Sequence, residues 1–251
     1  MAQQTGVDRV VPKWHELLDR WPDAAALAGA DLGDILAVWT GLGYPRRARD
    51  LQATARQVVE RHGGVVPDVL SDLLALSGVG PYTARAVLAF AFEQPVGVVD
   101  TNVARVLARS QGRRLASREA QATADALVPA GDGWLWNQTL MEVGAVFCRP
   151  TPRCDGCPVR GRCRWADDGW PEPDPAPGSA GVSRRQARFA GSDREARGRL
   201  MRALLAAPQS RRDALAATGV VGDEERAGRI VDGLIADRLV LADSDGAVRL
   251  P

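Results

Sequence analysis

Two groups of residues in this chain of 251 residues have the chemistry of a functional site. Asp100 directly follows the apolar run 96–99. A carboxylate held rigidly at the end of a buried segment is suited to catalysis. Its simpler interpretation is an N-cap for a helix near 102–108, because a carboxylate oxygen accepts the unpaired amides of a helix start. The second group is the cysteines, four in all, which fall between positions 148 and 163.

The cysteines are separated by five, two and five residues, which is close enough for all to reach one metal site. In a chain with no other cysteine, this clustering favours metal binding over disulfides. Four thiolates hold either a tetrahedral zinc ion or a [4Fe–4S] cluster. The spacing alone does not separate zinc from iron–sulfur. The sequence places these ligands at Cys148, Cys154, Cys157 and Cys163.

A glycine-rich turn precedes Asp100 in the chain. Gly78 and Gly80 flank one apolar residue, so we expect the backbone at both to turn sharply through angles that a Cβ would forbid. Pro81 follows where proline is tolerated best, at the first position of a helix. Apolar residues at helical spacing, from Ala84 to Ala91, predict a buried helix behind the turn. Unpaired amides and the positive helix end would bind an anion. An ordinary corner between two helices explains the turn equally well.

The composition limits the classes of function. Hydrophobic residues make up 45% of the chain, enough for a real core, and the formal net charge is only +1. Bulk charge therefore gives no indication of a nucleic-acid partner. No apolar run is long enough to span a bilayer and no signal sequence opens the chain, so we expect a cytoplasmic protein. Lys13 is the only lysine.

Helical periodicity dominates the first two thirds of the chain, which predicts an all-α core over 1–166. The expected helices lie near 7–21, 31–39, 45–62, 68–76, 81–91, 102–109, 117–127 and 134–147. Residues 167–192 are rich in proline and glycine and are predicted to be a linker. Residues 193–251 predict three helices and a β-ribbon, a small winged-helix-like module. A second binding surface and a packing or protein-contact role are both open for it.

Several motifs in this order resemble the helix–hairpin–helix DNA glycosylases of the endonuclease III superfamily. The hairpin, the segment Pro95–Val106 and the cysteines carry this resemblance. Within the superfamily, three further motifs look most like MutY-type adenine DNA glycosylases: Gln3-Gln4-Thr5, Trp39-x-Gly41-Leu42-Gly43-Tyr44 and Asn137-Gln138. The tail departs from that pattern, since it is too short for the Nudix-like domain of well-known MutY-type enzymes.

The resemblance implies base excision from DNA, with the target nucleotide flipped out of the duplex. Asp100 would stabilise the positive charge that grows on the sugar as the N-glycosidic bond breaks. Leu42 and Tyr44 would be wedge residues, with arginines 46, 47 and 49 on nearby phosphates. Bifunctional relatives carry a nucleophilic lysine where this chain has Tyr82, so we expect a monofunctional enzyme. The implied DNA-binding residues are Gln3, Gln4, Thr5, Leu42, Tyr44, Gly78, Gly80, Tyr82, Thr83 and Asn102.

The resemblance also bears on the cofactor and the partners. The superfamily's usual cysteine spacing is six-two-five, which favours a [4Fe–4S] cluster here, although the first gap is one residue shorter. Five arginines between 149 and 164 would give the loop a cationic surface. We expect a monomer that binds double-stranded DNA containing an adenine mispair, associates with the nucleoid and does not bind membranes.

One element of the MutY-type pattern lies outside residues 1–251. The glutamate that protonates adenine comes two residues before the methionine that matches Met1. The chain either extends upstream in its native form or is a catalytically weak or inactive DNA-binding paralogue. We predict excision of adenine opposite 8-oxoguanine or guanine, and the alternative enzyme on this scaffold is a uracil or thymine mismatch glycosylase.

Overall fold

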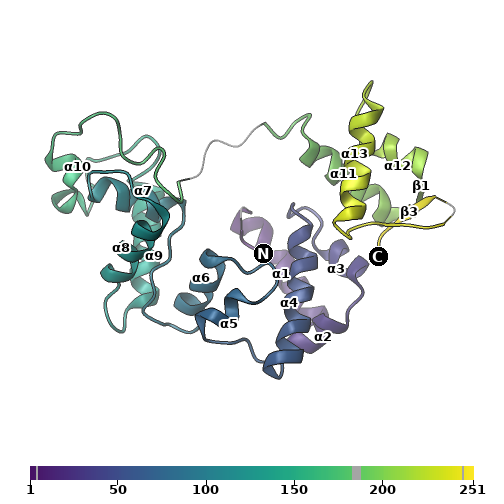
Figure 1. Cartoon of the computed structure of the whole chain (residues 1–251), viewed down its shortest axis with the longest axis horizontal. Helices are drawn as coiled ribbons and strands as arrows, with labels where there is room; N and C mark the ends of the chain where they lie inside the picture. Colours follow the sequence, from purple (N-terminus) through teal and green to yellow (C-terminus); the bar gives the residue numbers. More distant parts are fainter. Residues whose placement is uncertain (4, 183–187, 245) are drawn as a thin grey trace. The chain divides into compact units, whose positions relative to one another are not determined.

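The computed structural model describes residues 1–3, 5–182, 188–244 and 246–251, and the chain divides into two compact units (Figure 1). The first unit comprises Met1–Pro67, Leu76–Gly78 and Gln186–Pro251. The second unit comprises Asp68–Ala75 and Val79–Arg185. The first unit therefore draws on segments that are distant in the sequence, whereas the second is nearly continuous.

The N-terminal part of the first unit is helical. Its helices are α1 (Val7–Arg20), α2 (Ala24–Gly29), α3 (Leu32–Val38) and α4 (Arg46–His62). Asp31 caps α3 as a carboxylate should, accepting a hydrogen bond from the amide of Gly33 at 2.7 Å. Helix α2 was not predicted; Asp23 caps it, and its single buried residue is Leu27. A helix with so little apolar periodicity gives almost no sequence signal.

The C-terminal module follows the predicted order of three helices and a ribbon. It consists of α11 (Asp193–Ala206), β1 (Gln209–Ser210), α12 (Arg211–Ala217), α13 (Glu224–Ala236), β2 (Leu241–Ala242) and β3 (Ala247–Arg249). The strands are antiparallel in the order β1-β3-β2, with Gln209 opposite Val248. Strand β1 was not predicted, since two residues are too short to show alternation.

The second unit is also helical. It contains α5 (Leu70–Leu74), α6 (Pro81–Ala91), α7 (Thr101–Ser110), α8 (Ser117–Leu127), α9 (Gly133–Val146), the 3₁₀ turn η1 (Arg160–Arg162) and α10 (Arg164–Asp167). The mostly helical fold is thus confirmed. Its core joins one face of α7 to α8 and α9 through residues such as Val103, Leu107 and Leu140. Among the described residues, none of the helices has both the length and the apolar character needed to cross a membrane.

The predicted linker is partly an ordered strap on the second unit. Ala176 is 1% exposed and Ser179 is 5% exposed. The Ser179 hydroxyl accepts from the amide of Leu115 at 3.2 Å, and the Ala180 amide donates to the Leu115 carbonyl at 2.9 Å. Proline and glycine exclude regular structure without excluding packing. Residues 183–187 of the expected linker lie outside the described residues.

Candidate functional site

Asp100 is the N-cap of α7, and hydrogen bonds orient both of its carboxylate oxygens. Oδ1 accepts from the amide of Val103 at 2.7 Å, and Oδ2 accepts from Nδ2 of Asn102 at 2.9 Å. The residue is half-buried. The capping role expected from the sequence and a fixed carboxylate are therefore the same arrangement. A carboxylate held in this way can face developing positive charge without first reorganising.

Asn102 is itself held by Arg105, which the sequence analysis did not single out. Arg105 is 7% exposed and donates to Oδ1 of Asn102 at 2.7 Å. It also donates to the carbonyls of Gly144 at 3.0 Å and Cys148 at 2.8 Å. Because Oδ1 accepts from Arg105, the amide nitrogen of Asn102 is left to face Asp100. An arginine within the buried stretch of α7 is the signal that points to such a network.

Tyr82 and Asp100 lie within electrostatic reach of each other in the second unit. Burial raises the pKa of the Tyr82 hydroxyl, and the negative charge of Asp100 raises it further. Tyr82 stands on the first turn of α6 and is still 42% exposed. The residue at the position of the family's lysine is therefore a neutral phenol beside the carboxylate. Thr83, the next DNA-contact prediction, is half-buried.

The glycine-rich turn uses its two glycines differently. Gly78 has φ +70°, and a Cβ there would lie 2.6 Å from Cβ of Asp50, so only glycine fits. Gly80 has φ −89°, with nothing within 4 Å of its ideal Cβ. The expectation that Gly80 needs a glycine-only backbone is therefore wrong. Helix α6 begins with Pro81 in its first turn and without a side-chain cap from Gly80, and its N-terminus carries the positive end of the helix dipole.

In the first unit, Arg47 joins the two MutY-like motifs. Its guanidinium donates to Oγ1 of Thr5 and to the carbonyls of Leu42 and Gly43, each at 2.9 Å. The Thr5 hydroxyl also donates to the Leu42 carbonyl at 2.9 Å. The guanidinium lies 5.5 Å from the ring centre of Tyr44. Arg47 is thus an internal brace, and the expectation that it serves phosphates is wrong for this structure.

The wedge residues also differ in exposure. Tyr44 is 37% exposed and has φ +50°, so its side chain stands out from a tight turn. Leu42 is 4% exposed and belongs to the core of the first unit, and it could act as a wedge only by leaving that core. Gln3 is exposed and Thr5 is buried, whereas Gln4 lies outside the described residues.

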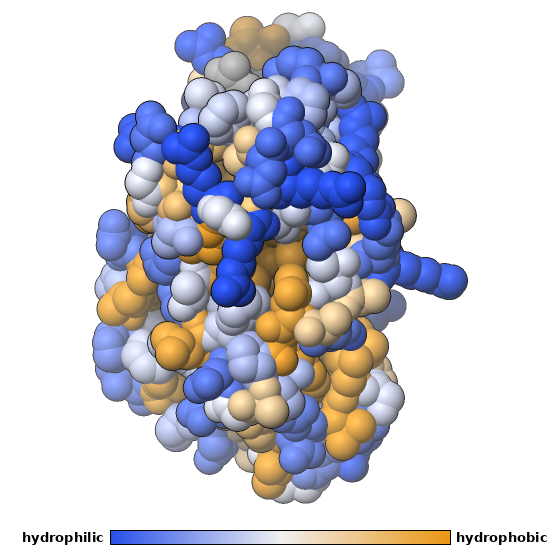
Figure 2. Space-filling model, turned by 90° about the vertical axis from the view of Figure 1, so that its left-hand side faces the viewer, coloured by the Kyte–Doolittle hydropathy of each residue, from blue (hydrophilic) through white to orange (hydrophobic). Residues whose placement is uncertain are grey.

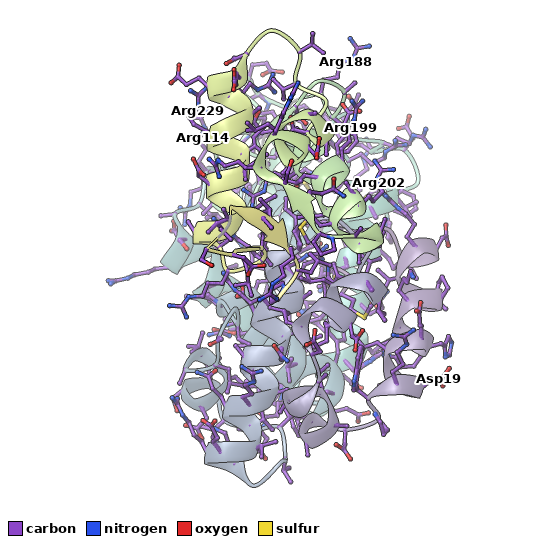
Figure 3. The ribbon with its side chains drawn as sticks, turned by 90° about the vertical axis from the view of Figure 1, so that its right-hand side faces the viewer. Asp19, Arg114, Arg188, Arg199, Arg202 and Arg229 are labelled. Atoms are coloured by element: carbon purple, nitrogen blue, oxygen red, sulfur yellow. The ribbon has the colours of Figure 1, made fainter. Side chains whose placement is uncertain are left out.

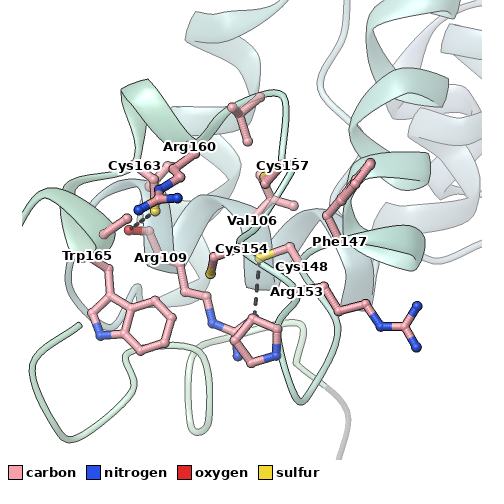
Figure 4. Close-up of a pocket in the computed structure, with 14 residues that line it drawn as sticks. Val106, Arg109, Phe147, Cys148, Arg153, Cys154, Cys157, Arg160, Cys163 and Trp165 are labelled. Carbon is pink, nitrogen blue, oxygen red and sulfur yellow. Dashed lines mark hydrogen bonds between the residues drawn. The ribbon is translucent and has the colours of Figure 1, made fainter. Parts of the chain in front are cut away.

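All four cysteines line one cavity of about 30 Å³ in the second unit (Figure 4). Val106, Phe147 and Trp165 supply its apolar wall. Within the described residues, no three Cys, His, Asp or Glu side chains are arranged to hold a metal ion as they stand. The four thiols line the same cavity, and four thiolates are the donor set of either a tetrahedral zinc ion or a [4Fe–4S] cluster.

Arg109 closes this cavity and was also missed by the sequence analysis. It is 2% exposed, and its Nη1 donates to Sγ of Cys148 at 3.3 Å (Figure 4). Asp174 of the strap accepts from the same guanidinium at 2.6 and 3.0 Å. Burial raises the pKa of the Cys148 thiol, and the hydrogen bond from Arg109 offsets part of that rise. For Asp174, burial is outweighed by Arg109, so its pKa is lowered.

The surface around the cysteine loop is polar. Figure 2 shows the corresponding side of the molecule, on which hydrophilic residues dominate the upper part. The five arginines of the loop are all exposed: Arg149, Arg153, Arg160, Arg162 and Arg164. Arg160 has an acidic neighbour, Asp155, at 3.7 Å. A cationic surface for phosphates at this loop stays a prediction.

The second unit also contains a groove of about 610 Å³ beside Tyr82. Helices α5, α6 and α8 line it together with Val99 and Gly181. Arg85 and Asp125 form an ion pair at 2.6 Å along its wall. The groove places polar and apolar groups next to the start of α6.

Comparison with known proteins agrees with this arrangement. Residues 1–130 match the family described as "HhH-GPD superfamily base excision DNA repair protein". The chain is 38% identical to the "Adenine DNA glycosylase" of Mycolicibacterium smegmatis over 100% of this chain and 84% of that protein. It is 40% identical to the "Adenine DNA glycosylase" of Mycobacterium tuberculosis (strain CDC 1551 / Oshkosh), over 100% of this chain and 83% of that protein. Among solved structures, a thermostable thymine-DNA glycosylase superposes with a TM-score of 0.61 and 27% identity, covering 66% of this chain and 80% of that one.

Proposed function

The chain belongs to the HhH-GPD superfamily of base excision DNA repair proteins and, within it, to the adenine DNA glycosylases, and from this premise we propose that it excises adenine paired with 8-oxoguanine or guanine. The observation that carries the proposal is the oriented carboxylate of Asp100 beside Tyr82. Such a site suits hydrolysis of an N-glycosidic bond, in which the sugar becomes positively charged before water adds to it.

In this mechanism, the bond between C1′ of deoxyribose and the adenine nitrogen breaks, and the electron pair leaves with the base. Asp100 stabilises the resulting positive charge on the sugar. Water then forms the new bond to C1′ and loses a proton, and the departing adenine gains one. Resemblance assigns protonation of adenine to a glutamate before the residue that matches Met1, so no residue from 1 to 251 is given that role.

The enzyme is proposed to be monofunctional. Lyase chemistry through a Schiff base requires an amine nucleophile. Lys13 is the only lysine, and its Nζ forms an ion pair with Glu16 at 2.8 Å on α1. The phenol of Tyr82 has no amine to offer. Borohydride treatment during turnover is expected to trap no covalent protein–DNA adduct, and a trapped adduct would contradict this assignment.

DNA is proposed to contact groups in both units. In the second unit, the positive N-terminal end of α6 is proposed to lie near a backbone phosphate. In the first unit, Tyr44 is the exposed apolar side chain of its turn and is proposed as the wedge that replaces the flipped nucleotide in the stack.

Cys148, Cys154, Cys157 and Cys163 are proposed to hold a [4Fe–4S] cluster. Their placement around one cavity supports this, because four thiolates are the ligand set that such a cluster requires. The cluster, when bound, supplies a covalent link between distant parts of the loop and a polarisable centre in it. Arg109 would balance the charge of the Cys148 thiolate.

Base release from a panel of duplexes tests the proposal. The protein translated from the complete reading frame is incubated with duplexes that carry adenine, thymine or uracil opposite 8-oxoguanine or guanine, and strands are cleaved with alkali afterwards. Cleavage confined to the adenine strand is expected. Cleavage at thymine or uracil would identify a mismatch glycosylase, and tight binding with no cleavage in any duplex would identify an inactive paralogue.

A further inference from the structure

Helix α4 begins with the wrong charges for a helix N-terminus. Its first turn carries Arg46, Arg47 and Arg49 and no acidic residue, and Pro45 at the N-cap provides no side-chain acceptor. The N-terminus of a helix carries positive partial charge, so cations there are unfavourable. Arg49 pairs with Asp50 of the same helix at 2.7 Å, whereas the carboxylate that pairs with Arg46 comes from elsewhere in the sequence.

The C-terminal module supplies that anion through Asp237, which is 7% exposed. Its Oδ1 accepts from Arg46, and its Oδ2 accepts from Arg197 on α11. Its backbone carbonyl accepts from Arg49. Burial by itself would raise the pKa of Asp237, but the hydrogen bonds and charges of the two arginines outweigh burial and lower it. The carboxylate is thus ionised, and each of its two oxygens accepts a hydrogen bond from an arginine.

Asp237 is equally misplaced for its own helix. It is the C-cap of α13, and a carboxylate is unfavourable at the negative end of a helix. Arg46 is unfavourable at the N-terminus of α4 and Asp237 is unfavourable at the C-terminus of α13, but the two charges stabilise each other across the contact. Residues that violate a local rule in this matched way indicate that the contact itself has a purpose.

The contact continues into a shared core. Trp39 and Leu42 belong to the same buried cluster as Leu234 and Leu239 of the module. A Cβ on Gly33 would lie 2.7 Å from the carbonyl oxygen of Pro251, so the chain end packs directly on α3. The module is therefore docked on the helices that flank the Tyr44 turn.

The module's own surface arginines are mostly neutralised. Figure 3 shows Arg199, Arg202 and Arg229 projecting from it. Arg199 pairs with Glu195 at 2.8 Å, and Arg229 pairs with Glu225 at 2.7 Å. On α12, Arg211 pairs with Asp232 at 2.6 Å. An arginine paired with a carboxylate contributes less net positive charge to attract phosphates.

We propose that Asp237 is a positioning residue for Tyr44, and that residues 193–251 brace the wedge instead of gripping DNA. The ion pair fixes the first turn of α4, where Arg47 in turn holds the carbonyls of Leu42 and Gly43 that precede Tyr44. The role rests on the proposed function, because the wedge matters only if a nucleotide is flipped.

The test compares Asp237→Asn with Asp232→Asn, a control on the same helix whose ion pair with Arg211 is exposed. One readout is single-turnover adenine release opposite 8-oxoguanine and opposite guanine. The other is fluorescence of a 2-aminopurine next to the mispair, which reports stacking of the wedge in the absence of chemistry. The temperature of each assay is kept well below the unfolding midpoint of every variant.

Asp237→Asn is expected to slow release about 10-fold and to change the 2-aminopurine signal, as Tyr44→Ala does, while affinity for undamaged duplex stays unchanged. The rate of adenine release by the double variant Asp237→Asn/Tyr44→Ala should be no lower than that of Tyr44→Ala alone. Additive losses, an unchanged 2-aminopurine signal, or a loss of duplex affinity with a shallower salt dependence would overturn the brace. Since fluorescence and affinity need no turnover, a wild-type protein that releases no adenine would refute the proposed function separately.

Discussion

Asn102 donates a hydrogen bond from Nδ2 to Oδ2 of Asp100 at 2.9 Å, and Arg105 fixes which way that amide points by donating to its Oδ1 at 2.7 Å. The carboxylate is thereby connected through buried polar groups to the carbonyl of Cys148, which accepts from the same arginine at 2.8 Å. The catalytic candidate and the cysteine loop are thus parts of one hydrogen-bonded assembly in the second unit.

Asn102 was expected to bind DNA, but both ends of its amide are bound to Asp100 and Arg105, so replacing it should weaken catalysis without weakening binding. Asn102→Ala removes the donor to Oδ2, and a hydrogen bond to a charged group contributes about 1.5 kcal/mol, so the single-turnover rate should fall about 10-fold. Asn102→Asp places a like charge beside Asp100 and should cost more. Duplex affinity, measured in parallel, should be unchanged for the alanine variant. Equal rates for wild type and both variants would contradict the role of Asn102.

Gly144→Ala should destabilise the second unit. A Cβ there would lie 2.6 Å from Cβ of Asn102 and 2.7 Å from the backbone of that residue, so α9 and α7 would have to separate. Overpacking of this kind costs about 1–3 kcal/mol, which urea unfolding measures directly. Gly198→Ala is the matched control, because that helical glycine has open space around it. It should stabilise the protein by about 1 kcal/mol.

Purified protein should be brown and contain about four iron atoms per chain. Cys157→Ser should lose most of the visible absorbance and iron, because a neutral hydroxyl replaces one thiolate ligand of the proposed cluster. Elemental analysis with sulfide determination separates the alternatives. A colourless protein that contains one zinc ion per chain would replace the cluster with the simpler tetrahedral site.

The lowered pKa of Asp237 leads us to expect that its contribution to the free energy of unfolding depends on pH. Its folded pKa is lowered from the ordinary value, so its ion pairs stabilise the protein above the unfolded pKa of about 3.9 and lose that effect as pH falls through the folded pKa. The difference in unfolding free energy between wild type and Asp237→Asn should therefore be constant near neutrality and shrink below about pH 4. Urea unfolding across this range measures it, and a difference that does not change with pH would contradict the ionised pair.

Local patterns in the sequence predicted the helices well where apolar periodicity and caps agreed. Helix α8 begins and ends at the predicted residues, and Asp100 caps α7 as expected. Contacts between distant residues could not be predicted in this way. Arg46 and Arg49 were assigned to phosphates because nothing near them in the sequence shows that Asp237, nearly two hundred residues away, accepts from both.

The site shows the same limit. Cysteine spacing indicated four ligands, and all four line one cavity, but the spacing does not reveal that Arg109 also lines it and is held by Asp174. The glycine at position 80 was interpreted through backbone strain, whereas its backbone is extended and its surroundings are open. Residues that are close in the sequence are enough to predict helix caps and turns. Ion pairs between distant residues depend on how the helices pack, so they cannot be predicted in this way.

The most direct measurement of the central claim is single-turnover adenine release from an A·8-oxoguanine duplex by wild type and Asp100→Asn, with duplex affinity measured for both. The asparagine can still cap α7 but carries no charge to stabilise the sugar cation. The account predicts a rate at least about 100-fold lower with affinity retained. A rate within a few-fold of wild type would show that Asp100 is a helix cap and nothing more.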